Sequence, residues 1–427
     1  MGYDPPMSRS HPLHAGRRSG GAGDLRQGNL TQILRHVRDH GASSRHDIAH
    51  GCGLGISTMT DLVGELRARG LVRELEPVRR PGAGRPTKPI ALDGDAWCVL
   101  GVQLDMLEAS FVCTTVGGRE LWREQVPLQL LHSGPERGFA LFHEALCGQL
   151  RRIPEERTLV AVHLALPGYV AGDGGTVSWC PTLGWDGLEL KTAVYDTVYG
   201  AGWENVTVGV EHDGHLAALQ AVRAELPPPM PEVAVYLGGL RELNGGVVLD
   251  GEIFRGADGG AGDLGHVRVQ PDGPACGCGR RGCLESLLGP EQLLVRSGLV
   301  TASEAERLTT FEPFRGLQML VEAARTGHPG VLQALQDGGG ALGVALDGII
   351  GTLNPHAVVL GGYLSLLGPS LLGTLQEGLD ARTAIGPFAS TQVVSLETVS
   401  VSRVVLGAAL AARDAVLQDP LNLTHPL

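Results

Sequence analysis

The sequence predicts an α/β protein in which a small, basic, helical head precedes a larger body of two sheet-centred lobes. Three observations support this fold class. The 427 residues are too many for one ordinary domain, and the net charge changes sign along the chain. The apolar residues follow helical spacing in the first part of the chain, whereas strands and helices alternate after about residue 97.

The composition excludes several classes of protein. With 43% hydrophobic and 19% charged residues, the chain does not belong to the mainly disordered class. Its 63 glycines lack the G-X-Y period of collagen. The sequence has no apolar run of about 18 residues, which would span a membrane, and no apolar stretch typical of a secretory signal. We therefore expect a soluble, cytoplasmic protein without a membrane partner.

The charge is distributed unevenly between the two parts of the chain. Residues 1–92 carry 14 basic and 8 acidic side chains, whereas the remainder carries 20 basic and 38 acidic side chains. A basic head on an acidic body indicates that the head alone meets a polyanion. A solvated basic tail would give the same balance, so charge leaves both interpretations open.

The first 92 residues predict a tail, three helices and a hairpin. Residues 1–25 are rich in Gly, Pro, Ser and Arg without apolar periodicity, which predicts a disordered tail. Within residues 26–92, Ser44 suits the N-cap of a second helix, and a third helix begins near Ile56. The apolar faces of the first and third helices consist of Leu30, Ile33, Leu34, Val37, Met59, Leu62, Val63 and Leu66. LVREL and KPIAL follow as two strands.

The body, residues 93–427, contains two similar halves. The first half has three successive strands, CVLGVQL, ASFVCTTV and GRELWREQV, then a helix and the buried strand LVAVHLAL. The second half repeats strands and helices up to AVVLGG and a last helix. We expect a first lobe of about residues 93–212 that includes a C-terminal helix, about 403–427. The second lobe spans about 213–402, and a cleft separates the lobes.

One cluster of metal-ligating residue types stands out. His266, Cys276, Cys278 and Cys283 form an H-x9-C-x-C-x4-C pattern. Three thiolates and one imidazole are the donor set of a closed, tetrahedral, structural Zn²⁺ site, and four protein ligands leave no open position for a catalytic metal. Reduced thiols beside an unrelated histidine are the alternative. We predict one structural Zn²⁺ per chain.

The same segment carries a family resemblance. GHVRV followed by CGCGRRGCLES resembles the hallmark of the ROK family (repressors, open reading frames and sugar kinases), and the resemblance extends over residues 30–427. LALPGYV, PTLGW, VEHDG and NPHAVVLGG are similar to further family segments in the same order. The resemblance implies an N-terminal winged helix-turn-helix and a two-lobed actin-like (ribonuclease H-like) sugar-kinase-type domain.

The resemblance also implies a sugar pocket. Its ligand-binding residues in this chain would be Thr182, His212, Asp213, Asp263, His266 and Glu285. Thr182 and His212 stand where the family has Asn, and Asp263 is one methylene shorter than the usual Glu. These changes fit either an altered ligand or a pocket that binds none. Because a polar cluster remains, we expect a sugar or sugar derivative as effector.

The phosphate loops depart from the kinase pattern. Family kinases have a strand ending in Asp-x-Gly, where this chain has Gln103 and Asp105. A neutral amide cannot partner Mg²⁺ as a carboxylate does, and Asp105 would repel a triphosphate. Glu242 interrupts the glycines of the second loop, GGLRELNGG. We therefore predict no kinase activity and no catalytic residue, although Asp213 stands at the general-base position.

The head resembles the DNA-binding domain of ROK repressors over SRHDIAHGCGLGISTMTDLVGELRARGLVRE, with a small helical interaction module as the alternative. A winged helix places its third helix in the major groove. Base edges would face Ser57, Thr58 and Thr60, and phosphates would face Arg45, Arg67 and Arg69. The wing RRPGAGRPTK suits a narrow minor groove, unless it is an ordinary solvated loop. Its basic residues are Arg79, Arg80, Arg85 and Lys88.

These observations together predict a sugar-controlled transcriptional regulator, a repressor, that binds double-stranded operator DNA. Because operators of this kind need two half-sites, we expect a homodimer or homotetramer. Two alternatives remain open from the sequence. One is an active ATP-dependent sugar kinase with a fused DNA-binding head, and the other is a DNA-binding regulator that needs no ligand.

Overall fold

The structure, a computed structural model, describes residues 22–77, 87–172, 174–227, 230–367, 391–395 and 403–423. It divides into two compact units, Met1–Asp93 with Leu417–Leu427, and Gly94–Val416. We call the described part of the first unit the head and that of the second the body. Among the described helices, none is long and apolar enough to cross a lipid bilayer.

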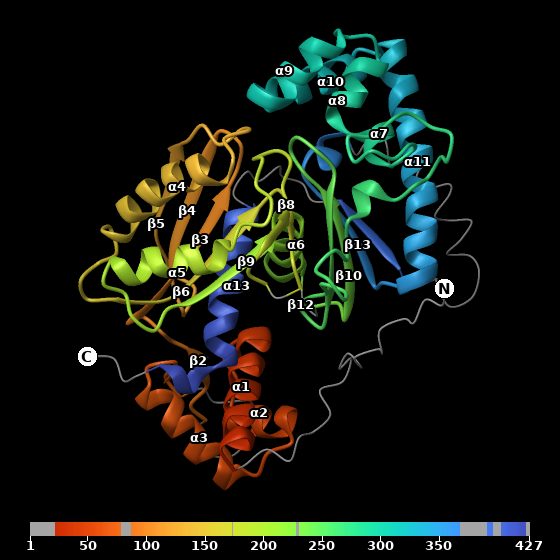
Figure 1. Cartoon of the computed structure of the whole chain (residues 1–427). Coiled ribbons are helices and arrows are strands. Elements are labelled where there is room, and N and C mark those ends of the chain that lie inside the picture. Colours follow the sequence, from red (N-terminus) through yellow and green to blue (C-terminus); the bar gives the residue numbers. More distant parts are fainter. Residues whose placement is uncertain are drawn as a thin grey trace, which may run out of the picture. The chain divides into compact units, whose positions relative to one another are not determined.

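The head has the predicted three helices and hairpin (Figure 1). Ser44 caps the second helix by accepting a hydrogen bond from the Asp47 backbone N–H at 3.2 Å. The predicted apolar residues of the first and third helices are all buried, which explains why these short helices are stable together. The elements are α1 (Ala22–His40), α2 (Arg45–Cys52), α3 (Ile56–Ala68) and the antiparallel strands β1 (Val72–Glu74) and β2 (Ile90–Leu92).

The start of the head differs from the prediction of a disordered tail over residues 1–25. Helix α1 begins at Ala22, and its first turn contains Asp24, an acidic residue that favours a helix N-terminus. The next residues are held by side-chain contacts that the tail's composition did not reveal: Arg26 donates to Glu65 at 2.8 Å, and Gln27 to Asp419 at 2.9 Å. Residues 1–21 lie outside the described part of the chain.

The C-terminal end also differs from the predicted lobe boundary. Helix α13 (Arg403–Gln418) leads into a short 3-10 helix, η4 (Pro420–Asn422), and the residues from Leu417 onward group with the head rather than with the first lobe. The Arg69 guanidinium donates to the carbonyl oxygens of Leu421 and Leu423, at 3.3 and 2.6 Å. Arg69 therefore anchors the end of the chain within the head.

The body contains two five-stranded sheets with the same design. In each sheet three antiparallel strands in a meander are extended by parallel strands, in the orders β5-β4-β3-β6-β9 and β12-β11-β10-β13-β14. The first sheet consists of β3 (Trp97–Leu104), β4 (Glu108–Thr115), β5 (Glu120–Pro127), β6 (Thr158–Leu166) and β9 (Thr207–His212). The second consists of β10 (Val233–Gly238), β11 (Asn244–Leu249), β12 (Glu252–Ile253), β13 (Ala357–Leu360) and β14 (Gln392–Ser395).

Helices pack against both sheets (Figure 1). Helices α4 (Pro135–Leu150) and α5 (Leu190–Gly200) pack on the first sheet. Helix α6 (Asp213–Gln220) contacts both α13 and the strands of the second sheet. The second lobe is covered by α7 (Glu285–Leu288), α8 (Pro290–Arg296), α9 (Ala302–Phe311), α10 (Pro313–Arg325) and α11 (Pro329–Leu353). This confirms the predicted two-lobed α/β architecture.

Candidate functional site

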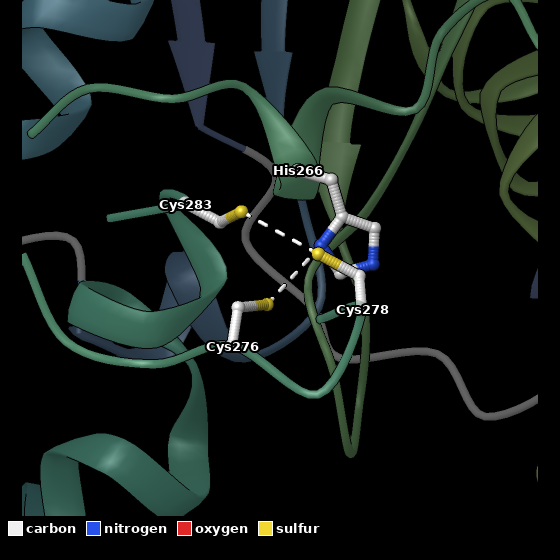
Figure 2. Close-up of side chains that lie close together, drawn as sticks. All are labelled: His266, Cys276, Cys278 and Cys283. Carbon is white, nitrogen blue, oxygen red and sulfur yellow. Dashed lines mark hydrogen bonds between the residues drawn. The ribbon is translucent and has the colours of Figure 1, made fainter. Parts of the chain in front are cut away.

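The four predicted metal ligands lie together in the second lobe (Figure 2). One side-chain atom of each residue lies within 4.8 Å of the others: an imidazole nitrogen of His266 and the Sγ atoms of Cys276, Cys278 and Cys283. The Cys276 Sγ lies 3.5 Å from the His266 Nδ1, and the Cys278 Sγ lies 3.6 Å from the Cys283 Sγ.

These distances fit a tetrahedral metal ion. With bonds of about 2.3 Å to sulfur and about 2.0–2.1 Å to nitrogen, the edges of a zinc tetrahedron are roughly 3.7 Å between sulfurs and 3.6 Å between sulfur and nitrogen. The observed separations are close to both values. The cluster can therefore hold a divalent cation such as zinc.

The local backbone explains how so short a loop presents three thiols. The turn from Cys276 to Arg280 is closed by a hydrogen bond from the Cys276 N–H to the Arg280 carbonyl at 2.8 Å. Gly282 has φ +69°, and a Cβ on it would lie 1.5 Å from the carbonyl oxygen of Gln270. Only glycine fits at this position, which sets the path of the chain into Cys283.

Without a bound cation, burial disfavours the thiolate form of two of the three cysteines. Burial raises the pKa of Cys276 to about 12 and raises that of Cys283. Burial also acts on Cys278, but hydrogen bonds from Arg280 outweigh it and lower the pKa to about 7. A metal ion would supply the positive charge that the other two thiolates need.

A cavity of about 420 Å³ adjoins the cluster and contains most of the predicted ligand-binding residues. Thr182, His212, Asp263, His266 and Glu285 line it. Asp213 lines a second cavity of about 360 Å³. The two cavities share five lining residues and form adjoining parts of one cleft: Met106, Pro167, Arg241, Glu242 and Asn244.

His212 has a defined tautomer. Its Nδ1 accepts a hydrogen bond from the Gly214 N–H at 3.1 Å, which caps α6, so the proton resides on Nε2. Burial lowers the pKa of His212 to about 3, so the ring is neutral. The Nε2 lies 3.6 Å from the Asp213 Oδ1. His212 therefore offers an N–H donor, as the Asn expected there would.

Asp263 is paired with an aromatic residue that the sequence analysis did not single out. The Tyr169 hydroxyl donates to the Asp263 Oδ2 at 2.6 Å, and the Arg280 Nη2 lies 4.0 Å from the same oxygen. Tyr169 thus contacts the carboxylate that is one methylene shorter than expected. Trp179, also missed, lines the same cavity. The sequence signal that could have revealed them is a pair of aromatic residues ten positions apart beside the Pro-Gly loop.

Several carboxyl groups face one another in the cleft. The Glu285 Oε2 accepts a hydrogen bond from the Leu243 N–H at 2.6 Å. Burial, together with the charge of Glu242, raises the pKa of Glu285 to about 8. The Glu242 side chain is exposed within the cleft. Partial desolvation by the cleft walls, and then the negative charges of Asp213 and Asp105, raise the pKa of Glu242 to about 7.

The two altered phosphate loops are joined by an ion pair that the sequence did not predict. The Arg241 guanidinium contacts the Asp105 Oδ2 at 2.5 Å, and its Nε donates to the Thr310 carbonyl at 3.3 Å. Arg241 lines both cavities. The Gln103 Oε1 lies buried in this region and has no hydrogen-bond partner among the described residues. Asp105 and Arg241 therefore meet between the loops that bind nucleotide phosphates in a kinase.

In the head, the predicted DNA-contacting residues have different surroundings. Ser57, Thr58 and Thr60 are exposed on α3. The carboxylate of Glu74 lies 2.5, 3.7 and 3.5 Å from the cationic groups of three predicted residues, Arg45, Arg67 and Lys88. Arg69 is occupied by carbonyl groups of the chain end, as described above. Arg79, Arg80 and Arg85 lie outside the described residues.

The acidic cleft leads to a testable pH dependence. Burial, and secondarily the charge of Asp105, raises the pKa of Asp213 to about 7, against about 3.9 in an unfolded chain. The folded protein therefore binds a proton that the unfolded chain has lost, so Asp213 lowers stability as pH rises from about 4 to 7. In the ligand-free protein, Asp213→Asn should raise the free energy of unfolding at pH 8 by roughly 1–4 kcal/mol.

The measurement is urea unfolding of both proteins between pH 4 and 8. The difference should become small as the pH approaches 4, because Asp213 is then protonated in the folded protein and about half protonated in the unfolded chain. Asp196→Asn, at an exposed position on α5, is the matched control and should change little. A stability difference that is the same at pH 4 and pH 8 would contradict the burial of an ionisable Asp213.

Known proteins resemble this chain over most of its length. The family model "ROK family" matches residues 142–415, more than half of the chain. A xylose repressor of Caldicellulosiruptor bescii is 23% identical over 377 residues, which is 86% of this chain and 91% of the relative. The DNA-binding transcriptional dual regulator NagC of Escherichia coli is 25% identical over 395 residues, with 86% and 92% covered.

Solved structures share the fold. A ROK family transcriptional regulator, a homolog of the E. coli MLC protein, matches with a TM-score of 0.73 at 22% identity and covers 93% of this chain and 98% of its own. A ROK family glucokinase from Streptomyces griseus, in complex with glucose and AMPPNP, has a TM-score of 0.57 at 23% identity, with 74% and 99% covered. The predicted fold class is confirmed, and this chain belongs to the ROK family.

Proposed function

We propose that the protein is a DNA-binding transcriptional regulator, acting as a repressor, whose body binds a sugar or sugar derivative. The observation that carries this proposal is the extent of the similarity to repressors. The xylose repressor and NagC align over 86% of this chain, whereas the glucokinase covers 74%. The chain therefore resembles the regulators over more of its length than it resembles the kinase.

The head offers the groups that a winged helix uses on DNA. Exposed Ser57, Thr58 and Thr60 on α3 suit base edges in the major groove. Arg67 and Lys88, with side chains 63% and 55% exposed, suit phosphates. We also propose, from the sequence, that the wing residues Arg79, Arg80 and Arg85 contact DNA. Two half-sites would require a homodimer or homotetramer.

We also propose that the body does not transfer phosphate from ATP. The ion pair of Asp105 with Arg241 joins the two loops that should surround the phosphates, so the charge of Arg241 is already balanced by a carboxylate and would be less available to a triphosphate. Gln103 provides a neutral amide where Mg²⁺ would need a carboxylate. Without phosphoryl transfer, Asp213 would serve as a hydrogen-bonding partner for a ligand hydroxyl rather than as a catalytic base.

The metal proposed for the thiol cluster is a structural Zn²⁺, held by His266, Cys276, Cys278 and Cys283. Bound zinc supplies folding free energy by cross-linking the loop. The cluster contributes two things to the sugar site: it fixes the His266 ring, and it holds the chain that enters Glu285. Both residues line the cavity.

We propose that the protein acts in the cytoplasm and that the sugar regulates its DNA binding by a population shift. A sugar changes DNA affinity only if it binds the DNA-competent and DNA-incompetent conformations with different affinity. The cleft between the two lobes is where such a difference arises most directly, because residues from both lobes line it.

The first test concerns the metal. Protein purified without chelators should contain one zinc per chain, measured by elemental analysis, and Cys278→Ser should lose it and unfold at a lower temperature. Cys147→Ser, a half-buried thiol on α4 outside the cluster, is the control and should keep the metal. A well-folded, metal-free wild-type preparation would exclude the structural zinc.

The second test concerns phosphoryl transfer. Glucose, xylose or N-acetylglucosamine incubated with ATP, Mg²⁺ and the protein should give no sugar-dependent ADP release in a coupled assay. Turnover on the order of 1–100 s⁻¹, the usual range of kinases, would instead support the alternative of an active kinase with a fused head. Slow ATP loss that does not depend on sugar would not support it.

The third test concerns DNA. An operator duplex is first selected by the full-length protein from a random-sequence pool. The double variant Arg67→Ala and Lys88→Ala should then bind it more weakly, with a flatter salt dependence in fluorescence anisotropy. Each lost phosphate contact reduces the log–log slope by roughly 0.9.

The control for this test is Arg325→Ala, an exposed arginine on α10 of the body with a side chain 72% accessible. It should leave both affinity and slope unchanged. If the head variant binds with the same affinity and slope as the wild type, these two residues do not contact phosphates, and the proposed face of the head is wrong.

A further inference from the structure

One wall of the larger cavity is aromatic. The short strands β7 (Tyr169–Val170) and β8 (Val177–Trp179) pair antiparallel, with Tyr169 opposite Trp179. Residues in such a cross-strand pair project from the same face of the ribbon. The two ring centroids lie 5.7 Å apart, and the His212 ring lies 5.9 Å from that of Tyr169. The three rings all line the cavity.

Trp179 is exposed to an unusual degree for so large an apolar side chain. Its accessible fraction is 41%, whereas Trp97 and Trp185 are at most 3% exposed. This exposed side chain is among the residues that line the cavity. Leaving a tryptophan face in water costs free energy that a stacked ligand recovers.

Tyr169 is held in place by its hydroxyl. The hydrogen bond to the Asp263 carboxylate, at 2.6 Å, fixes the tyrosine ring beside Trp179. A charge-assisted bond of this length restrains both partners. The aromatic pair is therefore largely preorganised, which reduces the entropic cost of binding a ligand on it.

The remaining lining of the cleft is largely polar and acidic. Glu242, Asp263 and Glu285 line the cavity, and Asp213 lines the adjoining one. Among the described residues lining the larger cavity, the one arginine or lysine is Arg241, which is paired with Asp105. Carboxyl groups hydrogen-bond to sugar hydroxyls whether or not they are ionised, and those that are ionised also repel a phosphate group.

We infer that Trp179 and Tyr169 form a stacking platform for the ring of an unphosphorylated pyranose. The C–H face of the sugar would lie on the Trp179 ring, whose π-face is electron-rich, and its hydroxyls would meet His212, Asp213 and Glu285. Trp179 is then a specificity-determining residue that selects a six-membered sugar ring with an apolar face. The inference rests on the proposed sugar-responsive function and assigns the class of its ligand.

The experiment is isothermal titration of the full-length protein with glucose, N-acetylglucosamine, xylose and glucose 6-phosphate. At least one neutral sugar should bind, and glucose 6-phosphate should bind more weakly than glucose. Trp179→Ala should weaken binding of the neutral sugar about tenfold, the effect of losing one aromatic contact. Trp179→Phe, which keeps an aromatic face, should recover most of this loss.

Tyr195→Ala is the matched control, because Tyr195 on α5 has the same 41% exposure and lies outside both cavities. It should leave sugar affinity unchanged. A bound sugar should also protect wild-type tryptophan emission from iodide, and Trp179→Phe should abolish that protection. Circular dichroism of each variant checks that it is folded.

The outcomes separate the inference from the function on which it rests. Sugar binding that is equally strong in Trp179→Ala, or tighter binding of glucose 6-phosphate than of glucose, would overturn the stacking platform and leave the sugar-responsive regulator intact. A Trp179→Ala variant with unchanged sugar affinity but an altered oligomeric state would assign Trp179 to a contact between copies of the chain instead. If no sugar binds, both the platform and the proposed sugar response fail.

Discussion

The proposed sugar site depends on one loop whose four metal-ligating side chains lie close together. His266, Cys276, Cys278 and Cys283 bring the ends of a short segment together, and the residues that flank them carry the polar groups of the cavity. Asp263 lies three positions before His266, and Glu285 lies two positions after Cys283. Because a tetrahedral metal site tolerates little variation in ligand position, a cation in this cluster would fix both carboxylates relative to the aromatic wall.

The cleft combines parts of a kinase with contacts that a kinase active site does not need. Asp213 remains at the start of α6, but its carboxylate accepts hydrogen bonds from Asn244. The Asn244 Nδ2 lies 3.2 and 3.3 Å from the two carboxylate oxygens. Asp105 and Arg241 neutralise each other between the phosphate loops. The cleft thus has polar groups suited to binding a ligand, and in the described part of these loops Asp105 is already paired with Arg241.

Much of this arrangement was predictable, because local patterns determine it. The helices of the head follow from apolar spacing and from the Ser44 cap, and the metal ligands follow from residue types that rarely occur together by chance. The contacts of Arg241 with Asp105 and of Tyr169 with Asp263 were not predictable, because each joins segments that are far apart in sequence. The start of α1 was missed for the same reason: Gln27 is held by Asp419, near the opposite end of the chain. Arg69 looked like a phosphate contact in sequence, whereas its guanidinium binds carbonyl groups of the last residues.

We propose that sugar binding in the body controls DNA binding by the head without phosphoryl transfer. The most direct measurement is the affinity of the full-length protein for its selected operator duplex, with and without a saturating sugar that binds it. We predict that the sugar shifts the DNA dissociation constant by about five- to 150-fold, the usual range of coupling between two sites. Added ATP and Mg²⁺ should not change this dissociation constant further. An operator affinity that is identical with and without bound sugar would contradict this coupling between sugar binding and DNA binding.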